Sequence, residues 1–310
     1  MTTDWAALAQ RPLAILGPTA SGKSTLALAI ADLAAADGHT VELVSIDSMQ
    51  VYRGMNVGTA TPTAAEQAAV RHHLIDLVDP SYAFTVSEFQ DLANTAIADI
   101  QSRGHVPVLV GGTGLYLRAV IDDLEIPGQF PDVLAELDAD PGTEGMHARL
   151  AELDPAAAAK MEPNNRRRVL RALEVTLGAG RPFSSFGPGL DTYGDSRFVQ
   201  VALRWDRTEL DQRIASRYEV QMADGFLDEV RWLAEQDPSR TAMQALGYRE
   251  LLAHVAGECT VAEALELAIT RTRQFARRQE RWFRRDTRIE WIDAPADPAV
   301  VLEHWRSAVV

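Results

Sequence analysis

Pro12-Leu-Ala-Ile-Leu-Gly-Pro-Thr-Ala-Ser-Gly-Lys-Ser-Thr25 contains a short apolar run followed by a complete G-x-x-x-x-G-K-[ST] motif. The apolar run predicts a buried strand and the residues after the motif predict a helix, which is the setting that a phosphate-binding loop requires. Backbone N–H groups and the helix N-terminus attract anions, Lys23 can reach a terminal phosphate, and the Ser24 hydroxyl can hold Mg²⁺. The predicted phosphate site comprises Gly17, Pro18, Thr19, Ala20, Ser21, Gly22, Lys23 and Ser24.

The composition is typical of a globular chain. Its 310 residues are 46% hydrophobic, which is enough for one large core and an insertion or a smaller second domain. The N-terminal residues lack a basic segment followed by an apolar one, so we expect neither export nor membrane insertion. The single cysteine, Cys259, cannot form an internal disulfide. We therefore expect a cytoplasmic protein, and we expect a monomer because no sequence feature indicates an obligate dimer.

Apolar runs alternate with helical stretches, which predicts an α/β fold with a parallel sheet. The strand-like runs are Leu13–Leu16, Val41–Ile46, Val106–Val110 and Phe198–Leu203. Residues 124–196 contain helical pieces without a convincing strand, so we predict an inserted helical subdomain there. Residues 1–123 and 197–310 then form the core, and the pattern from Arg207 onward is helical.

Two further segments follow predicted strands, where the ligands of parallel sheets gather. Asp47 comes directly after Val41–Ile46 and could be a general base, an outer ligand of Mg²⁺ or a helix N-cap. Gly111-Gly-Thr-Gly114 follows Val106–Val110, and Thr113 could donate to a phosphate or hold a reacting group. The alternative for these glycines is a tight turn that serves backbone conformation only.

His72 and His73 are adjacent, so in an extended segment their side chains point in opposite directions. No carboxylate or cysteine stands at ligand spacing from them, and we interpret them as structural or surface residues instead of zinc ligands.

Charge is segregated along a chain whose net charge is −14. Residues 122–162 contain eleven acidic and two basic residues, whereas residues 271–288 contain eight arginines and two acids. A helix over 261–283 would place apolar residues on one face and arginines on the other. The arginines predicted for the outer face are Arg273, Arg277, Arg281, Arg284 and Arg288, flanked by Arg271, Arg278 and Arg285. This surface predicts a polyanionic partner. The alternative is that some of these arginines pair with the acidic segment of residues 122–162.

Two activities fit a phosphate loop and a post-strand aspartate. A small-molecule kinase would use Asp47 to orient or deprotonate a hydroxyl and could close Arg166–Arg171 over ATP. A transferase acting on a nucleic acid would use the arginine surfaces to hold the polymer. The kinase hypothesis does not explain the C-terminal arginine cluster.

Seven motifs, in order, resemble the bacterial tRNA dimethylallyltransferase (tRNA isopentenyltransferase) family. They are Gly17–Thr25, Ser45–Ala60, His72–Asp76, Gly111–Tyr116, Arg171–Val175, Gln244–Arg249 and Thr272–Gln279. The resemblance implies a P-loop kinase-like core with a helical insertion and C-terminal helices, and a requirement for Mg²⁺. It also implies transfer of a dimethylallyl group from dimethylallyl diphosphate to the exocyclic amine of the adenine 3′ of the anticodon, with release of diphosphate. The family usually has Pro-Asn-Asp where this chain has Pro163-Asn-Asn165.

The resemblance also implies roles for individual residues. Asp47 would accept the proton of the amine, Thr113 would contact the diphosphate or the target nucleotide, and Lys23 would stabilise the departing diphosphate. Arg249 is a further candidate for binding diphosphate, with a surface position at a helix end as the alternative. The predicted contacts to tRNA and its anticodon stem-loop are Asp47, Ser48, Met49, Gln50, Thr113, Arg167, Arg168, Arg171, Gln274, Arg277, Arg278 and Gln279. A related class prenylates free adenine nucleotides, and the arginine helix favours RNA over that alternative.

Overall fold

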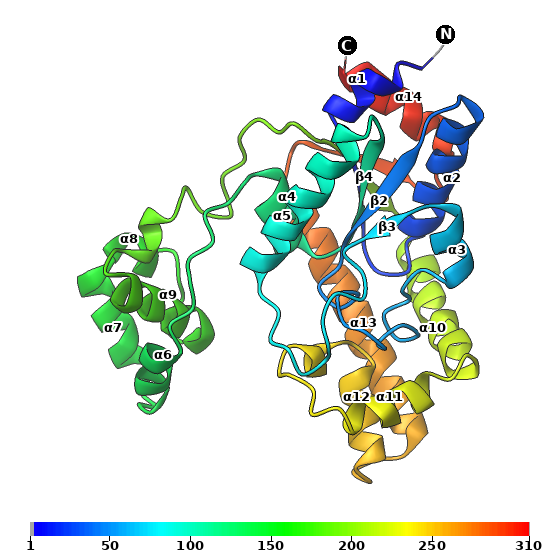
Figure 1. Cartoon of the computed structure of the whole chain (residues 1–310). Helices are drawn as coiled ribbons and strands as arrows, with labels where there is room; N and C mark the ends of the chain where they lie inside the picture. The colour runs from blue at the N-terminus through cyan, green and yellow to red at the C-terminus, as the bar shows by residue number, and fades with distance from the viewer. Residues whose placement is uncertain (1–2, 310) are drawn as a thin grey trace. The chain divides into compact units, whose positions relative to one another are not determined.

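The computed structural model describes residues 3–309 and divides into two compact units. One unit comprises Met1–Asp122 and Asp195–Val310, and the other comprises Asp123–Gly194. The first contains a six-stranded sheet in the order β3-β2-β4-β1-β5-β6, in which every neighbouring pair is parallel. Figure 1 labels β2, β3 and β4 of this sheet. Its strands are β1 (Leu13–Leu16), β2 (Val41–Ile46), β3 (His72–His73), β4 (Val106–Gly111), β5 (Val199–Arg204) and β6 (Ile289–Asp293). The predicted α/β fold with a parallel sheet is confirmed.

Helices of this unit connect and cover the strands. They are α1 (Trp5–Gln10), α2 (Lys23–Ala36), α3 (Ala64–Ala69), α4 (Val86–Ser102), α5 (Gly114–Ile121), α10 (Arg207–Ala223), α11 (Phe226–Ala234), the 3₁₀ helix η2 (Ala242–Gln244), α12 (Tyr248–Val255), α13 (Val261–Phe283) and α14 (Pro298–Val309). Capping boxes at Thr63, Thr85 and Thr260 fix the starts of α3, α4 and α13, because each threonine and the glutamate three residues later satisfy otherwise unpaired N–H groups.

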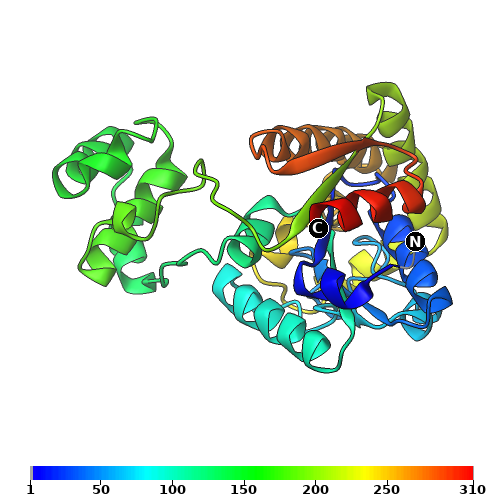
Figure 2. The ribbon, with the colours of Figure 1, turned by 90° about the horizontal axis from the view of Figure 1, so that it is seen from above.

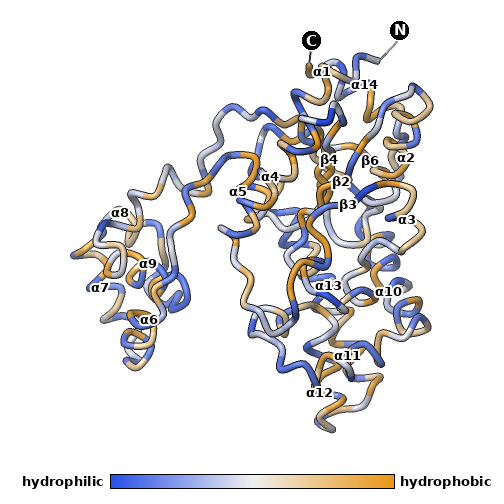
Figure 3. The backbone as a smooth tube through the Cα atoms, in the orientation of Figure 1, coloured by the Kyte–Doolittle hydropathy of each residue, from blue (hydrophilic) through white to orange (hydrophobic). Residues whose placement is uncertain are grey.

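Alternating residues of the central strand β1 divide the core between the two faces of the sheet. Leu13 and Ile15 pack in a cluster with side chains of α1, α2 and α14, whereas Ala14 and Leu16 pack with α4, α5, α10 and α13. Figure 2 shows α1 and α14 side by side near the two ends of the chain. Hydrophobic residues are concentrated along β2 and β4, which are buried over nearly their whole length (Figure 3). Central strands covered on both faces read as continuous apolar runs, which is why the sequence reveals them.

Two strands differ from the sequence-based expectation. Strand β3 has two residues, too few for a periodic signal. Strand β6 corrects the expectation of a purely helical chain after Arg207: Ile289–Asp293 pairs in register with Gln200–Arg204 of β5. It is an edge strand with only Ile289 fully buried, so its sequence lacks the apolar run that marks the central strands.

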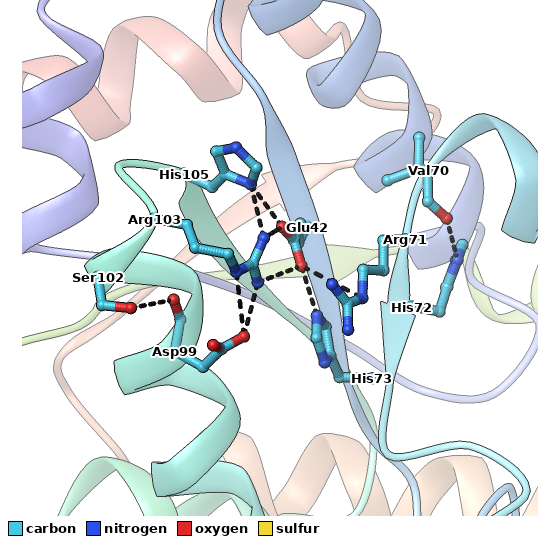
Figure 4. A network of polar contacts seen from close by, with 9 residues as sticks. All are labelled: Glu42, Val70, Arg71, His72, His73, Asp99, Ser102, Arg103 and His105. Atoms are coloured by element: carbon cyan, nitrogen blue, oxygen red, sulfur yellow. Dashed lines mark hydrogen bonds and ion pairs between the residues drawn. The ribbon is translucent and has the colours of Figure 1, made fainter.

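A polar cluster joins the amino-terminal ends of β2, β3 and β4 (Figure 4). The Glu42 carboxylate of β2 accepts hydrogen bonds from Arg103 and His105, which precede β4, and contacts His73 Nε2 of β3 at 2.6 Å. Its side chain is only 2% exposed. Burial raises the pKa of Glu42, but the hydrogen bonds from Arg103 and both histidines outweigh burial and hold the pKa well below its usual range. His72 contacts the Val70 carbonyl oxygen, so both adjacent histidines have structural contacts.

The second unit is helical. Its elements are α6 (Pro131–Asp138), α7 (Thr143–Leu153), α8 (Pro155–Ala158), α9 (Arg166–Ala179) and the 3₁₀ helix η1 (Phe183–Ser185). They enclose a small core of their own, which includes Leu150, Val169 and Leu173. Asn165 accepts a hydrogen bond from Arg168 N and caps the start of α9. The family usually has aspartate at this position, and both residue types are good N-caps. None of the helices between residues 3 and 309 has the length and apolar character of a membrane span.

Candidate active site

The register of the sheet brings the three polar segments to one edge. Leu16 of β1 and Ile46 of β2 both lie opposite Gly111 of β4, which runs between them. The phosphate loop, Asp47 and the Gly112-Thr113 turn therefore begin at the same level, at the carboxyl ends of three adjacent strands. This is the edge where open parallel sheets bind ligands.

The carbonyl groups of the phosphate loop are held by one of its own side chains and by two side chains from residues that follow β5. Lys23 Nζ donates to Pro18 O at 2.7 Å, Arg213 Nε donates to Ala20 O at 2.8 Å, and Trp205 Nε1 donates to Ser21 O at 2.9 Å. Gly22 has a φ of 87° and precedes α2 without a side-chain cap, so the N-terminus of α2 keeps its N–H groups for an anion.

Lys23 carries an altered pKa. Burial lowers the pKa to about 8, the nearby Asp47 carboxylate opposes this shift, and the positive charge of Arg217 adds to it. The ammonium group lies at the loop, 3.5 Å from Ser21 Oγ and bonded to Pro18 O. A bound phosphate would supply the negative charge that this desolvated ammonium lacks.

Asp47 and Thr113 are joined through a turn. Asp47 Oδ1 accepts a hydrogen bond from Met49 N at 2.8 Å, and Ser48 N donates to Thr113 Oγ1 at 3.3 Å. No helix follows Asp47, so the alternative that it caps a helix is wrong; it orders a turn instead. The Asp47 carboxylate lies near enough to Lys23 and Arg217 for its negative charge to oppose the lowering of both pKa values.

Two arginines of α10 complete the site and were missed from the sequence. Arg217 donates to Thr19 Oγ1 at 2.9 Å and to Gly58 O at 3.3 Å, while Arg213 stacks on the Trp205 ring 4.3 Å from its centroid. They are four residues apart and share one face of the helix. That spacing was the available signal, but only the pairing of β5 with β1 brings α10 to the loop.

Arg249, which was predicted to bind diphosphate, lies exposed in the first turn of α12. Within residues 3–309 no described contact joins its side chain to the phosphate loop, so its role stays a prediction. A cavity of about 40 Å³ lies beside the phosphate loop. Its wall includes Thr19, Arg217, Tyr218, Leu246 and Thr272.

The loop after Tyr52 is fixed by a half-buried carboxylate that the sequence did not single out. Glu229 of α11 accepts hydrogen bonds from the backbone N–H groups of Asn56, Val57 and Gly58 at 2.8–3.0 Å. Gln50, a predicted RNA contact, accepts from Ser45 Oγ at 2.7 Å and donates to Ala60 O at 3.1 Å. Its amide therefore orders this same loop.

The predicted helix over residues 261–283 is confirmed, but its arginines differ in surroundings. Arg288 was expected on the outer face of this helix; that prediction is wrong, because α13 ends at Phe283 and Arg288 forms ion pairs of 2.6 Å with Asp122 and Asp286. Arg273 donates to Asp211 O at 3.1 Å, and Arg271 pairs with Glu250.

Arg277, Arg278 and Arg281 form the part of α13 that we call the cationic face. All three are exposed, and the side chain of Arg277 remains 51% exposed although it lies 3.9 Å from the Asp211 carboxylate. Gln274 is also exposed. The surface is thus smaller than predicted at Arg271 and Arg288, because acidic residues of the same unit neutralise these two arginines.

In the helical unit, Arg167 and Arg168 are exposed at the start of α9. Arg171 is half-buried and bonds Glu174 and the Pro127 carbonyl, each at 2.8 Å. Arg171 therefore has a structural role in its own unit, while its predicted contact with RNA stays untested.

The family model described as IPP transferase matches residues 50–286. The chain belongs to the IPP transferase family. A tRNA dimethylallyltransferase of Bifidobacterium longum is 47% identical over 290 residues, covering 93% of this chain and 88% of the relative. One of Kineococcus radiotolerans is 48% identical over 294 residues, covering 92% of each chain. The resemblance read from the seven motifs is confirmed.

Solved structures of family members share the fold. The tRNA isopentenylpyrophosphate transferase of Bacillus halodurans is 36% identical, with a TM-score of 0.69 over 97% of this chain and 95% of that one. A eukaryotic dimethylallyltransferase, described as acting on tRNA, is 27% identical, with a TM-score of 0.76 over 91% of this chain and 73% of that one.

Proposed function

We propose that this chain is a tRNA dimethylallyltransferase. It transfers a dimethylallyl group from dimethylallyl diphosphate to the exocyclic amine of the adenine 3′ of the anticodon and releases diphosphate. The observation that carries the proposal is the meeting of a phosphate loop with Asp47 and Thr113 at three adjacent strand ends, in a member of this family. The names of the relatives support the choice of tRNA as acceptor.

The phosphate loop holds the leaving group. As the bond between C1 and the diphosphate oxygen breaks, negative charge builds up on the diphosphate, and N–H groups at the start of α2, Lys23 and Arg217 lie where they stabilise it. Because these donors are fixed before reaction by the bonds to Pro18 and Thr19, little reorganisation is needed.

Asp47 accepts the proton. The amine nitrogen bonds C1 as the diphosphate leaves, becomes acidic, and passes its proton to the carboxylate, which returns it to solvent. The turn that bonds Asp47 to Met49 N fixes the orientation of the carboxylate, and Thr113, bonded to Ser48 N, positions the acceptor beside it. Ser48 and Met49 would meet the base through this turn.

Mg²⁺ fits the residues present. Ser24 is exposed at the start of α2, and its hydroxyl has no hydrogen-bond partner among the described residues. Residues 3–309 contain no cluster of three carboxylate, histidine or cysteine side chains that could hold a metal by itself. Mg²⁺ keeps several waters and takes few protein ligands where substrate phosphates bind it, so Ser24 and the diphosphate together would hold it. Bound there, it would neutralise the diphosphate.

The cationic face, with Arg167 and Arg168 of the helical unit, supplies contacts to the RNA backbone. The target adenine must leave its stack, which costs a few kcal/mol and is least costly in a loop. An anticodon loop therefore suits this chemistry, and we propose a cytoplasmic monomer that acts on it.

The decisive assay supplies purified protein, Mg²⁺ and labelled dimethylallyl diphosphate with either tRNA or AMP. We expect label in tRNA alone. An RNA with inosine in place of the target adenosine is the matched control, because it lacks the exocyclic amine. Label in AMP would instead identify a free-nucleotide prenyltransferase, and phosphoryl transfer from ATP would identify a kinase.

A further inference from the structure

Gln279 of α13 contacts both loops of the active site. Its Oε1 accepts a hydrogen bond from Thr19 N of the phosphate loop at 2.9 Å, and its Nε2 donates to Gly112 O at 2.8 Å. One side chain thus joins the leaving-group side of the site to the turn that carries Thr113.

The fit around Gln279 is tight. The residue is only 7% exposed, and a Cβ on Gly112 would lie 2.4 Å from Gln279 Nε2. One helical turn further along α13, Trp282 packs on Gly114 so closely that a Cβ there would lie 2.3 Å from its ring. A side chain at Gly112 would displace the Gln279 amide, and one at Gly114 would collide with the Trp282 ring. The two glycines therefore permit the close contact between α13 and the turn.

The same helix carries the cationic face on its other side. Arg277 and Arg278, directly before Gln279, are exposed, whereas Gln279 points inward with both ends of its amide bonded to the protein. This arrangement does not suit Gln279 as an RNA contact, the role that its motif implies.

We propose that Gln279 is a positioning residue that sets the phosphate loop against the Asp47–Thr113 side of the site. The catalytic part of this proposal rests on the proposed function, the transfer of a dimethylallyl group to tRNA. Oε1 fixes the direction of the Thr19 backbone, and Nε2 fixes the Gly112 carbonyl beside Thr113. Loss of this link lets the departing diphosphate and the acceptor drift apart, and a misplacement of about 1 Å costs a rate factor of roughly 100.

The test uses the full chain with the variant Gln279→Ala. We expect kcat to fall about 10- to 100-fold, the affinity for inorganic diphosphate with Mg²⁺ to fall severalfold in calorimetry, and the Kd for tRNA to stay within about twofold. Gln90→Ala is the matched control, because Gln90 is likewise buried, with 8% exposure, and donates to Ala119 O at 2.9 Å near the C-terminal end of α5. It should lower thermal stability similarly and leave kcat unchanged.

Gln279→Glu provides a second readout. This variant keeps the shape and the acceptor for Thr19 N, but an ionised carboxylate cannot donate to Gly112 O. Protonation restores that donor, so the ratio of variant to wild-type kcat should rise as pH falls from 8 to 5.5. A purely structural glutamine would give no such rise, and this ratio remains informative if Gln279→Ala fails to fold.

Three results would overturn the proposal. One is unchanged kcat and diphosphate affinity in Gln279→Ala, and another is a weaker Kd for tRNA at unchanged kcat, which would make Gln279 an RNA contact. The third is a flat pH ratio in Gln279→Glu. If the wild-type protein fails to prenylate tRNA, the proposed function falls, while the diphosphate affinity of Gln279→Ala still tests the link to Thr19.

Discussion

Arg217 donates a hydrogen bond of 2.9 Å to the Oγ1 atom of Thr19 and so joins α10 to the phosphate loop. The same guanidinium donates to Gly58 O, which lies in the loop that Glu229 orders. A planar fork with several donors can serve both oxygens and still face an anion, which a lysine ammonium cannot do with the same geometry. Helix α10 therefore helps to shape the phosphate loop and the proposed diphosphate site.

Replacement of Arg217 by alanine should lower kcat about 100-fold, because one preorganised donor to the developing charge is lost. Arg217→Lys should recover only part of this loss. Steady-state kinetics with dimethylallyl diphosphate and tRNA measures the effect. Arg207→Ala, an exposed substitution at the start of the same helix, is the control and should retain wild-type kcat. Equal activities of the Arg217 and Arg207 variants would remove Arg217 from the site.

Lys23 should impose a pH limit on substrate capture. Burial lowers its pKa to about 8, so the ammonium charge is complete below that pH and is lost as pH rises through it. We expect kcat/KM for dimethylallyl diphosphate to fall up to tenfold per pH unit above about 8, because this parameter reports the free enzyme. Rate measurements from pH 6.5 to 9.5 test this.

Two variants of Lys23 sharpen the test. Lys23→Arg keeps its charge over this range and should be slower but lack the decline. Lys23→Ala should have a lower kcat even at saturating dimethylallyl diphosphate, since the ammonium stabilises the departing group. A raised KM with normal kcat would contradict that role.

Charge reversal on the cationic face should affect RNA alone. Arg277→Glu with Arg278→Glu should weaken tRNA binding and reduce the slope of log K against log salt, because fewer counterions are released. Diphosphate affinity should not change. Binding titrations at several salt concentrations measure this. Arg231→Glu with Arg306→Glu, on α11 and α14, makes the same change in net charge elsewhere and is the control. The cationic face has no part in binding if both double variants behave alike.

Glu42→Gln should lower the free energy of unfolding by about 3 kcal/mol at pH 7, because Arg103 loses the charge of a buried partner. The pKa of Glu42 is depressed, so its contribution is complete above the ordinary carboxyl pKa and is lost as pH falls below about 4.3. Urea unfolding between pH 3 and 7 should show the two proteins converging at the acidic end. The folded variant should keep its activity, since Glu42 and Asp47 belong to opposite ends of β2.

The central strands, the phosphate loop and α13 could be predicted because local pattern determines them. Strands β1, β2 and β4 are buried apolar runs, and the loop motif specifies its own backbone shape. Strand β6 and the paired state of Arg288 could not be predicted in this way. Both depend on partners distant in sequence, β5 for the strand and Asp122 for the arginine.

The sequence by itself determined the phosphate loop, the α/β class and the family, because these are written in contiguous motifs. Only the tertiary structure decided which side chains surround that loop. Arg213 and Arg217 reach it from α10, and Gln279 reaches it from α13, 260 residues beyond Thr19. The physical reason is the order of the strands. Strand β1 lies between β4 and β5, so the segments that follow those two strands surround its loop. No local pattern in residues 12–25 specifies which segments these are.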